Sequence, residues 1–207
     1  MSFASGYRGT SMGPVQTAVT DQPGVGVPGM LAFASDNDQI DSYSVGSGGV
    51  FAGFGVRLAT PTIASTKEDY SSIHTIPLDE ATLPTTGTIA AEFKGVTIFD
   101  EHMQSDASTG RPGWDAGRLA RIGRPIRAGL RVWIEAVDAW TKGSSTVNWV
   151  IVGGSDGKYL AGQFAPSALA GNSSAGYSVL LVASCVIART SAAAGGLVML
   201  EFQGVGA

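Results

Sequence analysis

Apolar side chains recur along this chain with a spacing of two or in short unbroken runs, which is the pattern of β-strands. Clusters of glycine and proline separate these stretches. The pattern predicts strands over residues 29–33, 50–57, 89–99, 131–137, 147–152 and 158–164. In the third of them, three side chains are available to a core: Phe93, Val96 and Ile98. Many short strands joined by glycine-rich turns favour a sandwich or a barrel.

The C-terminal part carries the clearest supersecondary pattern. Residues 177–188 are apolar and β-branched, a segment rich in alanine, serine and glycine follows, and residues 197–203 alternate. The alternation places Val198, Leu200 and Phe202 on one face. We therefore predict a β-hairpin here.

Three stretches break the strand pattern. Residues 36–41 are acidic and predict a turn, and residues 65–86 are polar with prolines nearby and predict a long loop. Residues 114–124 are the best candidate for one small helix, because their apolar positions fit a spacing of 3.6. The prediction from the pattern is an all-β fold, a single sandwich or barrel domain over residues 29–207.

Residues 1–28 differ from the rest of the chain. Glycine and proline punctuate them, so they lack the apolar periodicity needed to build a core of their own. A disordered tail and an extended N-terminal arm that grips a partner both fit this composition, and we favour the arm. Its candidate interface side chains are Phe3, Tyr7, Arg8, Met12 and Val15.

Charge adds two observations. Charged residues make up 14% of the 207 residues, against roughly 25% in ordinary soluble domains. Part of the surface is therefore expected to be buried against neighbours, and we predict a homo-oligomer, a trimer before a dimer. Residues 1–110 hold four basic and twelve acidic side chains, a balance of −8, whereas residues 111–207 hold nine and five, a balance of +4. The two halves can meet within a subunit or between copies; chance is the other explanation.

Cysteine content and hydropathy bear on location. Cys185 is the one cysteine, which excludes an internal disulfide framework and fits synthesis in a reducing cytoplasm. Its apolar neighbours predict a buried side chain and not a reactive thiol. No secretory signal is visible at the N-terminus, and the longest apolar run is far shorter than the ~18–20 residues of a membrane helix. We expect no membrane contact.

No motif supplies convincing chemistry. Residues 24–29 spell G-x-G-x-x-G, but Pro23 and Pro28 disrupt the strand and helix that a dinucleotide site needs, so a turn is the better interpretation. Residues 153–159 resemble a phosphate loop only loosely and predict a hairpin turn with its tip at Asp156-Gly157. The acidic and histidine side chains do not complete a metal or catalytic set; they are Asp36, Asp38, Asp41, His74, Asp100, Glu101, His102 and Asp106. The sequence predicts no enzyme, no metal and no cofactor.

A group of arginines is the most distinctive local feature. Five of the thirteen basic residues fall within fourteen positions and are interleaved with apolar side chains: Arg118, Arg121, Arg124, Arg127 and Arg131. Arginine suits protein interfaces because its planar fork pairs carboxylates and is weakly hydrated. A solvated face is the alternative. Nucleic-acid binding is the third, and the net charge of −4 and the lack of interleaved aromatic residues argue against it.

Several segments carry a family resemblance through their order and spacing. They are residues 28–32 (PGMLA) with the acidic stretch and IDSY that follow, 51–56 (FAGFGV), 93–96 (FKGV), 129–137 (GLRVWIEAV), 157–159 (GKY) and 196–201 (GLVMLE). Together they resemble the structural cement (capsid decoration) proteins of tailed bacteriophages, over about residues 28–204.

The resemblance implies a small β-barrel or jelly-roll-like module that oligomerises, often as a trimer, on the outside of an icosahedral head. Its expected partners are the major capsid protein and further copies of itself, and its expected location is the outer capsid surface of the virion, after synthesis in the host cytoplasm. It would decorate and stabilise the shell by spanning neighbouring subunits. Two other classes stay open: another virion part, such as a head-fibre base or a tail protein, and an enzyme whose site is assembled from scattered residues.

Overall fold

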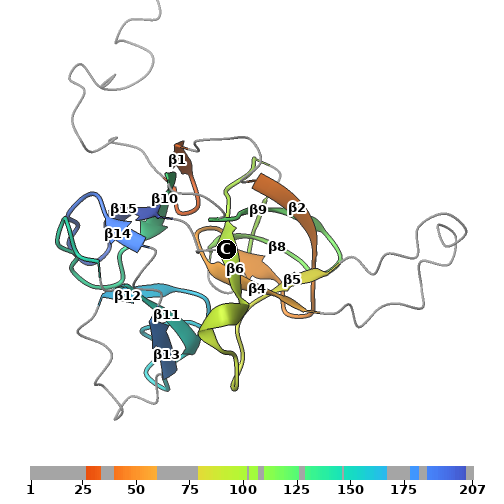
Figure 1. Ribbon diagram of the computed structural model, residues 1–207. Coiled ribbons are helices and arrows are strands. Elements are labelled where there is room, and N and C mark those ends of the chain that lie inside the picture. Colours follow the sequence, from red (N-terminus) through yellow and green to blue (C-terminus); the bar gives the residue numbers. More distant parts are fainter. Residues whose placement is uncertain are drawn as a thin grey trace, which may run out of the picture.

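Strands form nearly all of the regular structure in the computed structural model (Figure 1). The structure describes residues 27–33, 40–59, 79–101, 103–106, 110–125, 129–145, 147–166, 178–181 and 186–203. Within these ranges the helical structure is a single turn of 3₁₀ helix, η3 (Ala90–Glu92). The strands are β1 (Leu31–Phe33), β2 (Ile40–Val45), β3 (Val50–Phe51), β4 (Gly55–Ala59), β5 (Glu80–Thr82), β6 (Phe93–Thr97), β7 (Gln104–Ser105), β8 (Pro112–Trp114), β9 (Leu119–Gly123), β10 (Leu130–Glu135), β11 (Val147–Val152), β12 (Phe164–Pro166), β13 (Ser178–Leu181), β14 (Val186–Ala188) and β15 (Leu197–Phe202). The all-β prediction is confirmed.

Five strands close into a barrel in the order β2-β5-β4-β6-β9. The β2–β5 pair is parallel, the other pairs are antiparallel, and β2 completes the ring against β9. The alternation of β9 turns Ala120 and Ile122 into the barrel, where both are fully buried, and leaves Leu119 and Arg121 outside. The barrel core is made of small side chains: Val45, Val50, Val56, Ala81, Ala120 and Ile122. The predicted barrel is therefore present.

A second sheet, in the order β1-β10-β15-β14, packs against the barrel. β10 and β15 pair antiparallel over their full six-residue lengths. Alternation along β10 sends Leu130, Val132 and Ile134 into the main hydrophobic core and turns Arg131 and Glu135 to the other face of the sheet. This outer face carries most of the charged side chains of the sheet.

The main core lies where β6, the second sheet and the three-stranded sheet β12-β11-β13 meet. Four aromatic rings fill it: the ring of Phe93 lies 5.2 Å from Trp149, 6.0 Å from Phe164 and 6.1 Å from Phe202, measured between centroids. The indole nitrogen of Trp149 donates to the carbonyl oxygen of Gly55 at 3.3 Å, which ties β11 to β4. One continuous core thus holds the barrel and both sheets together.

The start of the described chain is fixed between the barrel and the second sheet. The backbone N–H of Gly29 donates to Trp133 at 2.7 Å, and its carbonyl oxygen accepts from Phe99 at 2.8 Å. Gly29 has a φ of +81°, and a Cβ at this position would lie 2.7 Å from the backbone nitrogen of Gly53. Only glycine fits here, so residue 29 belongs to the packed unit.

Several predicted strands are confirmed. β1, β6, β10 and β11 lie where the alternation placed them, and the three side chains assigned to the core near β6 are buried: Phe93, Val96 and Ile98. The hairpin is confirmed by the antiparallel pair β14–β15, whose buried face includes Val198, Leu200 and Phe202. The predicted turn at 153–159 joins the antiparallel strands β11 and β12.

The predicted helix over residues 114–124 is wrong. This segment contains the end of β8 and all of β9, with Gly117 between them at a φ of +79°. A positive φ interrupts a right-handed helix, and it reverses the chain so that Ala120 and Ile122 enter the barrel. Burial of alternate side chains in the barrel therefore outweighs the 3.6-residue spacing.

Other boundaries also need correction. Residues 50–57 form two strands, β3 and β4, because the chain turns at Gly53 with a φ of +78°. Residues 158–164 are mostly connecting chain, and only Phe164 belongs to a strand, β12. The run at 177–188 supplies two strands to different sheets, β13 beside β11 and β14 beside β15.

Four strands were not predicted at all: β2, β5, β7 and β8. Asp41, expected in a turn, lies in β2, and the loop predicted over residues 65–86 contains β5. β2 holds polar side chains at several positions and β5 has three residues, so neither shows a clear alternation. Cys185, Asp36, Asp38, His74 and His102 lie outside the described residues.

Candidate interaction surface

Four of the five predicted arginines lie on or next to β9 and β10, which follow each other in the sequence. Arg118 precedes β9, Arg121 lies on β9, Arg124 follows it, and Arg131 lies on β10. Arg127 and the predicted arm residues Phe3, Tyr7, Arg8, Met12 and Val15 lie outside the described residues.

Arg131 is held by a carboxylate of the neighbouring strand. Its Nε donates to Oε2 of Glu201 at 2.5 Å, and Arg189 donates to both oxygens of the same carboxylate at 2.8 and 2.5 Å. Gln203 adds another hydrogen bond. The bonds from Arg189 and then Arg131 lower the pKa of Glu201 from its usual 4.5 to about 2, against the effect of burial. With the Glu201 side chain 7% exposed, this cluster is an internal brace of the second sheet.

Arg124 is tied to the barrel in a similar way. Its Nη1 donates to Oδ2 of Asp41 at 2.8 Å, and the hydroxyl of Tyr43 donates to the same oxygen at 3.3 Å. Burial raises the pKa of Tyr43, while the hydrogen bond to Asp41 raises that of Arg124. The contact joins the end of β9 to β2, where the barrel closes.

Arg121 has a looser contact. Its Nη1 lies 3.9 Å from Oδ2 of Asp100, and its side chain is 48% exposed. A surface ion pair of this kind contributes little to stability.

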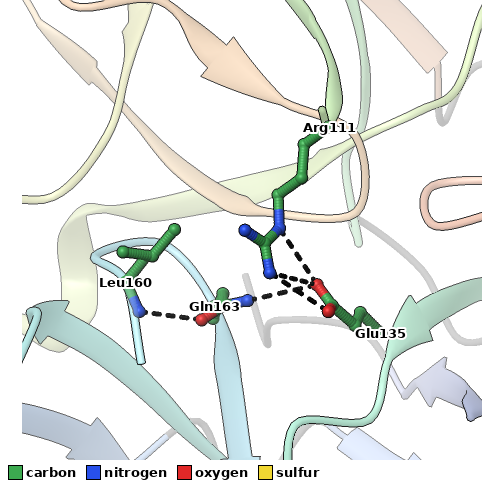
Figure 2. A network of polar contacts seen from close by, with 4 residues as sticks. All are labelled: Arg111, Glu135, Leu160 and Gln163. Carbon is green, nitrogen blue, oxygen red and sulfur yellow. Dashed lines mark hydrogen bonds and ion pairs between the residues drawn. The ribbon is translucent and has the colours of Figure 1, made fainter. Parts of the chain in front are cut away.

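A further arginine network, which the sequence did not predict, joins a small sheet of order β3-β8-β7 to the second sheet and to the sheet that contains β12. Figure 2 shows the fork of Arg111 on the carboxylate of Glu135, with three hydrogen bonds of 2.9–3.1 Å. Gln163 donates to the same carboxylate at 3.4 Å and accepts from the backbone N–H of Leu160 at 2.8 Å. The network connects the start of β8, the end of β10 and the loop before β12. A single acidic residue in a strand of mostly apolar side chains, such as Glu135 or Glu201, is the signal that could have indicated these pairs.

Arg118 differs from the other arginines. Within the part of the chain that the structure describes, its guanidinium has neither an ion pair nor a hydrogen bond. It borders a hollow of about 140 Å³ that is lined by Gln104, Gly113, Trp114, Asp115 and Arg118. Next to it stands Leu119, whose side chain is 63% exposed. This is the part of the described surface best suited to contact another molecule.

Other kinds of site find little support in the described residues. They contain no group of three or more His, Cys, Asp or Glu residues that could hold a metal ion. A second hollow, between Glu135 and Gln163, has a volume of about 10 Å³, which is the size of one water. None of the described helical structure is long and apolar enough to cross a membrane.

The fold and these surfaces define an all-β structural module. The phage family described as structural cement protein (E217 gp24/Pam3 gp6) matches residues 15–203. The chain therefore belongs to this family of structural cement proteins, and the resemblance inferred from the sequence is confirmed. No curated protein is significantly similar to the chain.

Proposed function

We propose that this chain is a virion structural protein that decorates the outer surface of an icosahedral capsid and stabilises it by binding across neighbouring subunits of the major capsid protein. The observation that carries the proposal is the cement-protein family match over residues 15–203. An all-β fold with a continuous hydrophobic core suits a rigid protein that bridges neighbouring subunits, and this role requires no catalytic step.

The proposed state of assembly is a homo-oligomer, a trimer in preference to a dimer. One oligomer that grips several shell subunits turns individually weak contacts into tight attachment, because each later contact is intramolecular. A protein that binds the expanded shell better than the compact precursor also shifts the equilibrium of the shell toward the expanded form. Neither nucleic acid nor membrane has a part in this role.

Two segments are the proposed contacts with the shell or with other copies. The first is the arm, residues 1–28, through Phe3, Tyr7, Arg8, Met12 and Val15. The second is the arginine-rich segment, whose outward side chains in the described structure include Arg118 and Arg121. Ordering an extended arm costs roughly 1–2 kcal/mol per residue, so buried contacts with a partner must offset that cost.

The direct test adds the purified chain to capsid shells assembled without it. We expect the chain to sediment with the shells at micromolar concentration and to raise the temperature at which they disrupt. Shells that neither bind the chain nor gain thermal stability would contradict the proposal.

A truncation tests the arm separately. Deleting residues 2–27 should leave the melting temperature of the free protein nearly unchanged, because Gly29 keeps its backbone bonds to Trp133 and Phe99. Binding to shells or between copies should weaken by about tenfold or more, an amount equal to ~1.4 kcal/mol. Unchanged binding would make the arm only a tail, and loss of folding would place it within the core.

A further inference from the structure

Arg118 stands apart from the other arginines that the structure describes. Each of the six others has a carboxylate partner: Arg57 with Glu92, Arg111 with Glu135, Arg121 with Asp100, Arg124 with Asp41, and both Arg131 and Arg189 with Glu201. Arg118 has none among the described residues. Among the arginines that the structure describes, this one guanidinium is thus left without an internal carboxylate partner.

The backbone around Arg118 is fixed. Its carbonyl oxygen accepts from the backbone N–H of Val45 at 2.8 Å, and the N–H of Gly117 donates to the carbonyl oxygen of Val45 at 2.7 Å. A further bond of 3.2 Å from the N–H of Arg118 to Asp115 closes the turn. A side chain presented from such a rigid turn loses less conformational entropy when it binds than one on a mobile loop.

The surroundings of Arg118 have the composition of a protein-binding anchor. The hollow beside it has a volume of about 140 Å³, far more than one water molecule needs, and is large enough to admit a side chain. Trp114 forms part of its wall, and Leu119, the residue after Arg118, is at 63% the most exposed large apolar residue of those described. Tryptophan and arginine dominate the energetic centres of protein interfaces.

We propose that this hollow receives a carboxylate side chain from the shell protein that the chain decorates, with an apolar neighbour of that carboxylate packed on Leu119. The inference rests on the proposed function and assigns its contact chemistry. A guanidinium pairs a carboxylate through two parallel hydrogen bonds, and the attraction strengthens as the contact excludes water. Asp115 also lines the hollow and repels any incoming anion, so the guanidinium of Arg118 must outweigh this repulsion when a single carboxylate enters.

The position of the hollow offers a matched control. Figure 1 shows β2 and β9 on the right of the molecule and β14 and β15 on the left. Lys142 is an exposed cation whose backbone N–H donates to Ser191, and the next residue, Gly143, bonds to Ala188 at the end of β14. Reversing the charge of Lys142 therefore makes the same change in net charge on the far side of the molecule.

The test compares the full-length chain with Arg118→Glu, Arg118→Lys, Leu119→Ser and Lys142→Glu in sedimentation with capsid shells assembled without it. We expect Arg118→Glu to lower the affinity at least tenfold, Arg118→Lys and Leu119→Ser to lower it about three- to tenfold, and Lys142→Glu to change it less than twofold. Melting temperatures of the free variants verify folding, and Leu119→Ser tests the same surface without altering charge.

The outcomes separate the two proposals. If the unaltered chain does not bind shells, the proposed function fails. If it binds, but Arg118→Glu and Leu119→Ser bind within twofold of it, the assignment of the hollow is overturned while the proposed function stands. The assignment is also overturned if light scattering shows that Arg118→Glu changes the mass of the free oligomer, because the hollow then receives a second copy of this chain.

Discussion

The two ends of the arginine-rich segment behave in opposite ways. At one end Arg131 is bound to Glu201, which Arg189 also holds, and the cluster braces the second sheet. At the other end Arg118 projects beside an open hollow, without a partner among the described residues. In the sequence both arginines alternate with apolar residues, so spacing alone does not distinguish them. The difference lies in the neighbouring residues: β15 supplies a buried carboxylate that bonds to Arg131, whereas Asp115, the described acidic residue that lines the same hollow as Arg118, forms no ion pair with it.

The largest effect on stability is expected at Glu201, which binds Arg131 and Arg189. Glu201→Gln should lower the free energy of unfolding by about 2 kcal/mol, because it removes the negative charge and one of the two acceptor oxygens that the two guanidinium groups share. The lowered pKa of Glu201 corresponds to at most ~3.4 kcal/mol, and the partial exposure of both arginines reduces that amount. Urea unfolding measures the change.

Glu92→Gln is the control for this variant. Glu92 pairs with Arg57 at 3.5 Å and its side chain is 40% exposed, so the loss should stay below ~0.5 kcal/mol. Equal losses in Glu92→Gln and Glu201→Gln would contradict the assignment of Glu201 as a brace.

The same brace should depend on pH. Because the folded pKa of Glu201 is lowered from 4.5 to about 2, its contribution is complete above about pH 4.5 and disappears as the pH falls toward 2. The stability difference between the unaltered chain and Glu201→Gln should therefore shrink over that window. A difference that stays constant from pH 6 to about pH 2, in melting temperatures by circular dichroism, would argue that Glu201 acts through packing and not through charge.

A smaller effect is expected at the junction of the three sheets. Arg111→Gln removes the fork on Glu135, and both side chains are about one-third exposed, so the loss should be about 1 kcal/mol. Arg111→Lys should recover only part of it, because a lysine cannot form both parallel hydrogen bonds. Full recovery by lysine would show that charge alone matters at this position.

The smallest effect on stability is expected at Arg118. Arg118→Ala should change the free energy of unfolding by less than ~0.5 kcal/mol, since the side chain has no partner within the described structure. A loss above 1 kcal/mol in the same urea experiment would place Arg118 with the braces and remove the contrast between the two ends.

The sequence predicts the parts of this fold that alternate over five or six residues. β10 and β15 are such strands, and their core-facing side chains follow from period-two spacing, whereas β11 is a mostly apolar run that is buried on both faces. Strands of two or three residues, such as β3 and β5, are too short to show a period, and the closure of β2 against β9 joins segments about 80 residues apart. Residues 114–124 were predicted to be helical because their apolar positions fit both a helix and a strand–turn–strand. The positive φ of Gly117 decides in favour of the strand–turn–strand.

The candidate site was predictable in part. The arginines stand out in the sequence, but which of them are already paired depends on carboxylates far along the chain. Arg131 and Glu201 are 70 positions apart, and Arg124 and Asp41 are 83 apart. Only the folded structure brings these pairs together and shows that Arg118 has no such partner among the residues it describes.

A reconstruction of the assembled particle by electron cryo-microscopy tests the account most directly. We predict density for the barrel and its two packed sheets on the outer capsid surface, bridging neighbouring subunits of the major capsid protein. The Arg118 side chain should lie within hydrogen-bonding distance of a shell carboxylate, while Arg131 remains on Glu201. Density for this chain in the tail or at a fibre base, or on the shell with Arg118 facing solvent, would contradict the account.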